Sequence, residues 1–196
     1  MSSPDRRTLI ADTAIATVAA AGLRGLTHRA IDTAAGLPPG STSYYFRTRT
    51  ALIGACYARI AELDLADFEP PEPGPAGPEE GKEAAAAALG RLLHRWLTIG
   101  RERQLARFEL TLEAARTPEL EPALREAGRA SRARAAAVLT ALGAARPQEA
   151  AELLVAWTEG TLFDRLTGAM SRARPAPDPA ELTRVARHAL DSVLAD

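Results

Sequence analysis

The sequence has one cysteine, few aromatic residues and no long apolar run. A single thiol, Cys56, excludes an internal disulfide and a cysteine-based zinc cluster. The apolar helical pattern around Cys56 predicts a small buried thiol rather than a redox sensor. No apolar run reaches the roughly 18 residues needed to cross a bilayer, and no charged-then-apolar leader opens the chain. We therefore expect a cytoplasmic protein.

The short motifs of common enzymes are also missing. The three histidines, His28, His94 and His188, lie far apart in the sequence, and no two of them have the spacing of metal ligands. The chain has no nucleophile elbow, phosphate-binding loop or dinucleotide fingerprint. We therefore expect no catalysis, no bound metal and no cofactor.

Charge is distributed unevenly along the chain, although the net charge is only −1. Residues 1–56 contain six arginines and three aspartates, which gives this segment a charge of +3 and leaves −4 for the remainder. A basic segment joined to an acidic remainder fits a protein that touches a polyanion at one end.

Helix-forming residues dominate the sequence, and strand signals are scarce. Apolar periodicity and capping residues predict an all-α fold of about nine helices. The expected helices are residues 6–21, 28–35, 39–45, 49–63, 82–100, 102–116, 122–142, 147–172 and 179–194. Residues 69–81 are rich in proline and glycine, so we expect a loop there.

The second and third predicted helices have the layout of a helix-turn-helix, packed on a longer first helix. Gly36 and Leu37 provide the small and apolar turn that lets the two helices cross closely. Compact polar or aromatic side chains then suit a major groove about 12 Å wide: Gly40, Ser41, Ser43 and Tyr44. Hydroxyl and guanidinium groups beside them are expected to bind phosphates: Thr27, Tyr45, Arg47 and Arg49.

The segment from Gly22 to Leu52 resembles the DNA-binding signature of the TetR family of bacterial transcriptional regulators. Its core reads Ala35-Gly36-Leu37-Pro-Pro-Gly40-Ser41-Thr-Ser-Tyr-Tyr45-Phe46-Arg-Thr48-Arg49. The resemblance implies base-facing roles for Pro39, Gly40, Ser41, Ser43 and Tyr44. It implies phosphate contacts for Thr27, Tyr45 and Arg49, with Arg49 standing where the family usually has lysine, and a packing role for Phe46.

Three positions depart from the family pattern. Pro38 replaces a capping serine, Thr42 replaces an aliphatic residue, and Ser43 replaces a tyrosine. The first change removes the side-chain cap of the reading helix, and the third removes one typical contact. Tyr44 or Tyr45 is the available substitute for that contact.

The rest of the chain resembles the family only in the number and order of its helices. We expect residues 1–50 to bind DNA and residues 51–196 to bind ligand and form the dimer. The resemblance implies a dimer interface on the last two helices: Leu162, Leu166, Leu182, Val185, Ala189 and Val193. Large apolar residues within residues 51–196, the body of the chain, mark the expected ligand pocket: Trp96, Phe108, Leu112, Trp157 and Phe163. In both cases the alternative is that these residues only close the core of one chain.

These observations together predict a homodimeric regulator that binds a palindromic operator in double-stranded DNA. We expect a repressor that a small-molecule effector releases from that operator. The alternative is a helical protein that binds a small molecule or a partner without specific DNA binding. In that case Tyr44, Tyr45 and Phe46 would form a core cluster.

Overall fold

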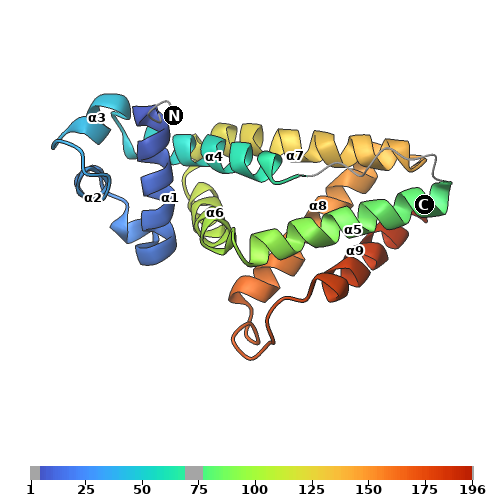
Figure 1. Cartoon of the computed structure of the whole chain (residues 1–196). Helices are drawn as coiled ribbons and strands as arrows, with labels where there is room; N and C mark the ends of the chain where they lie inside the picture. Colours follow the sequence, from blue (N-terminus) through green and yellow to red (C-terminus); the bar gives the residue numbers. More distant parts are fainter. Residues whose placement is uncertain (1–4, 69–76, 196) are drawn as a thin grey trace. The chain divides into compact units, whose positions relative to one another are not determined.

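The computed structural model describes residues 5–68 and 77–195 (Figure 1). Within these ranges the chain forms nine α-helices, one short 3-10 helix and no strands, which confirms the all-α prediction. The helices are α1 (Arg6–Gly25), α2 (His28–Ala34), α3 (Ser41–Tyr45), α4 (Arg49–Ala66), α5 (Pro78–Leu97), α6 (Arg101–Ala114), α7 (Glu121–Ala141), α8 (Pro147–Thr167) and α9 (Pro179–Leu194), with the 3-10 turn at Pro118–Leu120. No helix within the described ranges is both long and apolar enough to span a bilayer.

The prediction of a loop over residues 69–81 is wrong for its last four residues. Helix α5 begins at Pro78, so residues 78–81 are helical, while residues 69–76 lie outside the described ranges. Proline is tolerated at the first position of a helix because the N–H there has no partner to lose. Glu79 and Glu80 in the first turn also favour the positive end of the helix dipole.

Several other helix ends differ from the prediction, and two of them involve a glycine. Helix α8 ends at Thr167 rather than near residue 172, because the backbone of Gly168 leaves the helix with φ −59° and ψ 159°. Helix α1 is interrupted at Gly22, where we expected it to stop, and one more turn follows as far as Gly25. Gly168 therefore ends α8, whereas Gly22 interrupts α1 without ending it.

Residue contacts divide the chain into two compact units. The first contains residues 1–63 and 102–128, and the second contains residues 64–101 and 129–196. The first unit thus takes in most of α4, most of α6 and the start of α7 in addition to α1, α2 and α3. The functional division that we expect after residue 50 stays a prediction, because compactness alone assigns no role.

The core of the first unit is formed by apolar faces of α1, α2, α4 and α6. Its largest fully buried side chains are Ile10, Leu26, Ile31, Leu52, Ile53, Leu110 and Leu120. Cys56 lies inside this core and is fully buried, as predicted, and burial raises the pKa of its thiol to about 12. The hydroxyl of Tyr57 donates to the carbonyl oxygen of Leu110 over 2.7 Å, which ties α4 to α6.

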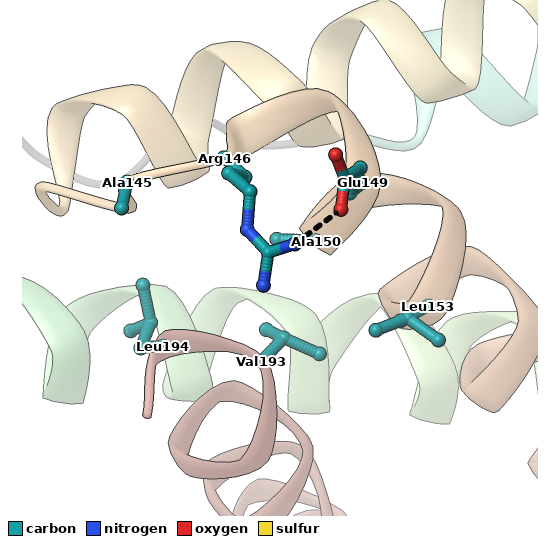
Figure 2. Close-up of a pocket in the computed structure, with 7 residues that line it drawn as sticks. All are labelled: Ala145, Arg146, Glu149, Ala150, Leu153, Val193 and Leu194. Carbon is teal, nitrogen blue, oxygen red and sulfur yellow. Dashed lines mark hydrogen bonds and ion pairs between the residues drawn. The ribbon is translucent and has the colours of Figure 1, made fainter. Parts of the chain in front are cut away.

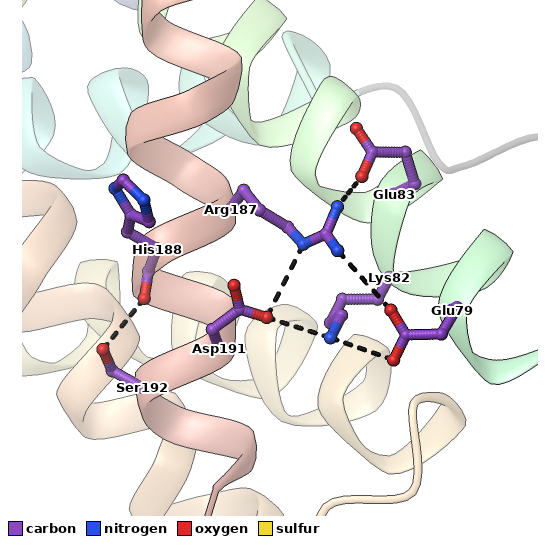
Figure 3. Close-up of polar contacts among 7 residues, drawn as sticks. All are labelled: Glu79, Lys82, Glu83, Arg187, His188, Asp191 and Ser192. Atoms are coloured by element: carbon purple, nitrogen blue, oxygen red, sulfur yellow. Dashed lines mark hydrogen bonds and ion pairs between the residues drawn. The ribbon is translucent and has the colours of Figure 1, made fainter.

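The second unit is organised around the close packing of α5 on α9. Gly90 of α5 makes this approach possible, because a Cβ atom built there would lie 2.5 Å from Oγ1 of Thr183. Ion pairs extend the contact at the surface, as Figure 3 shows. Lys82 lies 2.9 Å from the carboxylate of Asp191, and Arg187 pairs with Glu83. These pairs lie at the exposed edge of the packed surface and add only a small stabilisation to it.

Candidate nucleic-acid interface

The turn between α2 and α3 depends on a left-handed residue at the end of α2. Gly36 has φ 63°, a conformation that residues with a Cβ rarely adopt. The N–H of Leu37 then donates to the carbonyl oxygen of Asp32 over 2.8 Å, which closes the last turn of α2. Leu37 is buried, so the turn is anchored in the core of the first unit.

The first turn of α3 is capped by a residue of α2. Oδ2 of Asp32 accepts from the N–H of Gly40 over 2.7 Å. Oδ1 of the same carboxylate accepts from the N–H of Thr42 over 2.7 Å and from its hydroxyl over 2.6 Å. Gly40, with φ 91°, turns the chain so that these N–H groups face Asp32. The cap that Pro38 cannot supply therefore comes from eight residues upstream of Gly40.

The carboxylate of Asp32 is buried but remains ionised. Burial by itself would raise the pKa of this carboxyl. The hydrogen bonds from the Thr42 side chain and from the N–H groups of Thr42 and Gly40 outweigh burial and hold the pKa below its usual value. A negative charge at the N-terminus of a helix is also favoured by the helix dipole.

The other end of α3 is held by a second residue of α2. Nε2 of His28 lies 2.7 Å from the carbonyl oxygen of Phe46, the residue that follows the last turn of α3. A carbonyl oxygen only accepts, so Nε2 carries the proton in this hydrogen bond. Phe46 is itself buried in the core of the first unit, as the family resemblance implied.

The predicted base-facing residues lie on the exposed side of this short helix and its turn. Tyr44 is 80% exposed, and Pro39, Gly40 and Ser43 are exposed as well. Ser41 is partly buried, and its hydroxyl donates to the carbonyl oxygen of Pro38 over 2.6 Å. By contrast, Thr42 points inward and is fully buried. The structure thus brings the five candidates together on one solvent-facing segment.

Tyr45 is partly buried and packs at the edge of this segment. Its ring meets that of Tyr44 edge-on, with ring centroids 5.1 Å apart. The guanidinium of Arg7, in the first turn of α1, lies 5.7 Å from the ring centroid of Tyr45 and 5.3 Å from that of Phe46. Arg7 thus adds a positive charge at the border of the exposed segment.

Two further candidates already have partners within the chain. Thr27 caps α2, because its hydroxyl oxygen accepts from the N–H of Ala30 over 3.1 Å. Arg49 donates from its guanidinium to the carbonyl oxygens of Leu26 and Leu23, over 2.5 Å and 2.9 Å. Both side chains lie at an exposed edge of the first unit.

Three residues of this region were not predicted to have a role in it: His28, an isolated histidine in the sequence, Arg7 and Asp32. A local signal did exist for α2, because His28 and Asp32 are four residues apart and share one face of a helix. No local pattern relates Arg7 to Tyr45, since 37 intervening residues separate them in the sequence.

The predicted dimer residues are mostly buried within one chain. Leu162, Leu166, Leu182, Ala189 and Val193 all belong to the buried core, and Val185 is partly buried. The exposed face of α8 is formed by other side chains. It includes Leu153, which is 57% exposed, Phe163, which is 47% exposed, and the small residues Ala156 and Gly160 between them.

The predicted ligand residues fall in both units. The guanidinium of Arg107 lies over the ring of Phe108, 4.7 Å from the centroid of that ring. Leu112 is half exposed. In the second unit, Nε1 of Trp96 donates to Asp67 over 3.2 Å, while Trp157 packs on the core of that unit. Phe163 lies on the exposed face of α8.

Figure 2 shows a small pocket where the start of α8 meets the end of α9. It is lined by Ala145, Arg146, Glu149, Ala150, Leu153, Val193 and Leu194, and its cavity volume is about 40 Å³. Drug-sized ligands occupy pockets of roughly 300 Å³ or more. None of the five predicted ligand residues lines this pocket, so their role stays a prediction.

Comparison with known proteins places these observations in context. A family model described as the tetracyclin repressor-like C-terminal domain matches residues 80–196. A search of curated proteins found no match. A TetR family member from Streptomyces coelicolor A3 superposes with a TM-score of 0.72 at 29% identity, covering 97% of this chain and 99% of that one.

Two other solved structures are similar over nearly the whole chain. The multidrug binding protein EbrR, complexed with ethidium, has a TM-score of 0.71 at 29% identity and covers 97% of this chain and 99% of its own. A transcriptional regulator from Rhodococcus sp. Rha1 has a TM-score of 0.75 at 21% identity, with 97% of both chains covered. At that identity the second likeness concerns the fold.

Proposed function

The chain belongs to the TetR family of transcriptional regulators, and on this premise we propose that it is a cytoplasmic repressor released from its operator by a small molecule. The observation that carries the proposal is the exposed segment on and before α3. Tyr44 projects from this segment with 80% of its side chain exposed, which a core cluster of aromatic residues would not allow. We propose no catalytic role for the chain.

We propose that Pro39, Gly40, Ser41, Ser43 and Tyr44 face the bases of one major groove. Small side chains bring the backbone close to the base edges, and the ring of Tyr44 reaches farthest from the helix. Thr27 and Tyr45 are the proposed phosphate contacts beside them. For Arg49 we propose a positioning role, because two of its guanidinium nitrogens already donate to carbonyl oxygens.

We propose that two copies of the chain pair through the exposed face of α8. A single reading helix contacts only a few base pairs, so a two-fold dimer on a palindromic site is the usual arrangement. Leu153, Ala156, Gly160 and Phe163 offer an apolar strip with small residues in its middle, which suits close helix approach. The buried residues predicted for the interface would instead pack in the core beneath this face and hold α8 and α9 in position.

We propose that the effector binds among the aromatic residues of the body, with Trp96 and Trp157 as the first candidates. EbrR supports the choice of probe, since it was solved with ethidium at 29% identity to this chain and with proflavin at 27% identity. Both probes are planar aromatic cations. Ligand binding would then favour a conformation of the dimer that no longer fits successive major grooves.

The test begins with selection of preferred duplexes from a random DNA library by the full chain. We expect a palindromic consensus whose affinity falls steeply with salt, because phosphate contacts release counterions. Ethidium itself binds duplex DNA, so its effect on the protein is first measured by thermal shift in the absence of DNA. Binding that shows no sequence preference would contradict the proposed function.

A further inference from the structure

We propose that His28 and Asp32, one helical turn apart on α2, clamp the two ends of α3 and so set where its base-facing side chains stand. The inference rests on the proposed DNA-reading role of α3 and assigns the residues that position it. Neither His28 nor Asp32 is expected to touch DNA, because both side chains are engaged with the backbone of the reading segment.

Helix α3 needs such support because it contains only five residues. A helix this short is unstable by itself, since nucleation fixes several residues for very few hydrogen bonds. Its first N–H groups also have no acceptor within the helix. Pro38 and Pro39 precede it and provide neither an N–H nor a polar side chain for a local cap.

At the N-terminal end, one carboxylate of α2 satisfies three donors of the reading segment. Asp32 accepts from the N–H of Gly40 and from both the N–H and the hydroxyl of Thr42, at 2.6 to 2.7 Å. Hydrogen bonds to an ionised acceptor are short and about twice as strong as neutral ones. Asp32 and Thr42 are both buried, so water does not compete for the two bonds between them, while the bond from Gly40 is partly buried.

At the C-terminal end, the ring of His28 binds the carbonyl oxygen of Phe46 over 2.7 Å. Phe46 ends α3, and its N–H donates to the carbonyl oxygen of Thr42 over 2.8 Å. The side chains of His28 and Asp32 project from the same face of α2, as residues four apart do on a helix. Helix α2 therefore holds the reading segment at both ends as one rigid piece.

The residues of the reading segment itself support this arrangement. Pro38 offers no polar side chain for a local cap, and the polar side chain of Thr42 points inward and is fully buried. In the structure Thr42 contributes two of the three donors that bind Asp32. The cap therefore crosses the turn and uses Asp32 and Thr42 together.

The experiment compares full-length variants on the duplex that the unmodified protein selects and on a random duplex of the same length. Asp32→Asn removes the charged acceptor, and His28→Phe removes the ring donor while keeping a ring of similar size. Thr42→Val is the milder variant, because it removes one hydroxyl and leaves the N–H in place. Thr33→Ala is the matched control, since Thr33 lies on the exposed side of α2 and its hydroxyl donates only to Arg29.

We expect Asp32→Asn and His28→Phe to lower the preference for the selected duplex by about tenfold or more. Thr42→Val should lower it less, and Thr33→Ala should leave it unchanged. The salt dependence of binding to the random duplex should stay the same in all four variants, because no phosphate contact is removed. The helical circular dichroism signal should also be unchanged.

Two results would overturn the clamp. One is an unchanged preference in both Asp32→Asn and Thr42→Val, which would mean that the reading surface does not need the cap. The other is a loss of the salt dependence together with the preference, which would assign these residues to phosphate binding. If the unmodified protein selects no sequence at all, the proposed function fails first, and this outcome is seen before any variant is made.

Discussion

Arg49, the first residue of α4, donates from Nη1 to the carbonyl oxygen of Leu26, the C-cap of α1, over 2.5 Å. Nη2 of the same guanidinium donates to the carbonyl oxygen of Leu23 over 2.9 Å. A planar group with several donors reaches two carbonyls at once, which an ammonium group on a flexible stem does poorly. Arg49 therefore joins the start of α4 to the end of α1.

This geometry predicts that Arg49→Lys and Arg49→Ala weaken operator binding to a similar extent, by about tenfold. Both variants should keep the salt dependence of the unmodified protein, measured by fluorescence anisotropy over a salt series. A phosphate contact gives a different pattern. Arg49→Lys would then bind normally, and Arg49→Ala would lower the number of released counterions by about one.

Tyr44 and Tyr45 should separate base reading from phosphate binding. Replacing Tyr44 by alanine should change which bases are preferred under the reading helix, at a cost of about 1–3 kcal/mol for the original site. Tyr45→Phe removes only a hydroxyl and should weaken binding to all sequences equally. Selection from a random library with each variant checks both expectations. The same base preferences in Tyr44→Ala as in the unmodified protein would contradict the assignment.

The lowered pKa of Asp32 gives the first unit a defined response to acid. A carboxyl whose pKa is lower in the folded chain than in the unfolded chain stabilises the fold fully above its ordinary value of 3.8. This contribution is lost as the pH falls through the lowered folded pKa. We therefore expect the contribution of the Asp32 carboxylate to operator preference and to the stability of the first unit to be complete near neutral pH and not to vary with pH there.

Acid unfolding followed by circular dichroism checks this expectation. Asp32→Asn should be less stable than the unmodified protein at neutral pH, and the difference should shrink in strong acid. Asp5→Asn is the control, because Asp5 is an exposed aspartate. This variant should unfold in acid like the unmodified protein. A difference that grows as the pH falls would contradict the role of the Asp32 carboxylate.

Gly90 and Gly54 should respond oppositely to the same substitution. In Gly90→Ala the new Cβ would lie 2.5 Å from Oγ1 and 2.7 Å from Cα of Thr183, so α5 and α9 must separate. We expect a loss of about 1–3 kcal/mol in the free energy of unfolding. Gly54→Ala meets only the Cβ of Ala123, at 3.6 Å, and should stabilise α4 by up to about 1 kcal/mol. Thermal or urea unfolding measures both changes.

The exposed strip of α8 predicts which substitutions produce monomers. Leu153→Glu and Phe163→Glu should each shift the protein from dimer to monomer, because a charge buried in an apolar interface lacks a partner. Met170→Glu is the control, since Met170 is exposed but lies in the turn after α8. Sedimentation equilibrium reports the oligomeric state. A dimer that persists in both α8 variants would exclude this face.

Much of the fold could be predicted because its signals are local. Thr48 caps α4 through the N–H of Ala51, and Asp178 caps α9 through the N–H of Glu181; each stands directly before an apolar helical pattern. Gly36 likewise marks the end of α2. Each of these signals depends on residues within one turn of each other, so the sequence displays them directly.

The remainder depends on contacts between distant segments. The apolar stripes of α8 and α9 predicted burial correctly, but periodicity does not tell whether a stripe faces its own chain or another copy. Likewise, the phosphate contact expected of Arg49 stays a prediction, and no local pattern predicted its hydrogen bonds to the carbonyl oxygens of Leu23 and Leu26, which lie more than 20 residues earlier. Such pairings follow from the folded arrangement and not from any local pattern.

Because Asp32 caps α3 from a neighbouring helix, the exposed side chains of the reading segment are not needed to cap or hold that helix. Ser43 and Tyr44 can then be exchanged while Asp32, Thr42 and His28 keep the helix in place. Under the base-reading role that we propose, single substitutions at residues 43 and 44 would change the preferred operator and leave the fold of the first unit intact. The same separation would make these two residues a compact site for altering operator preference.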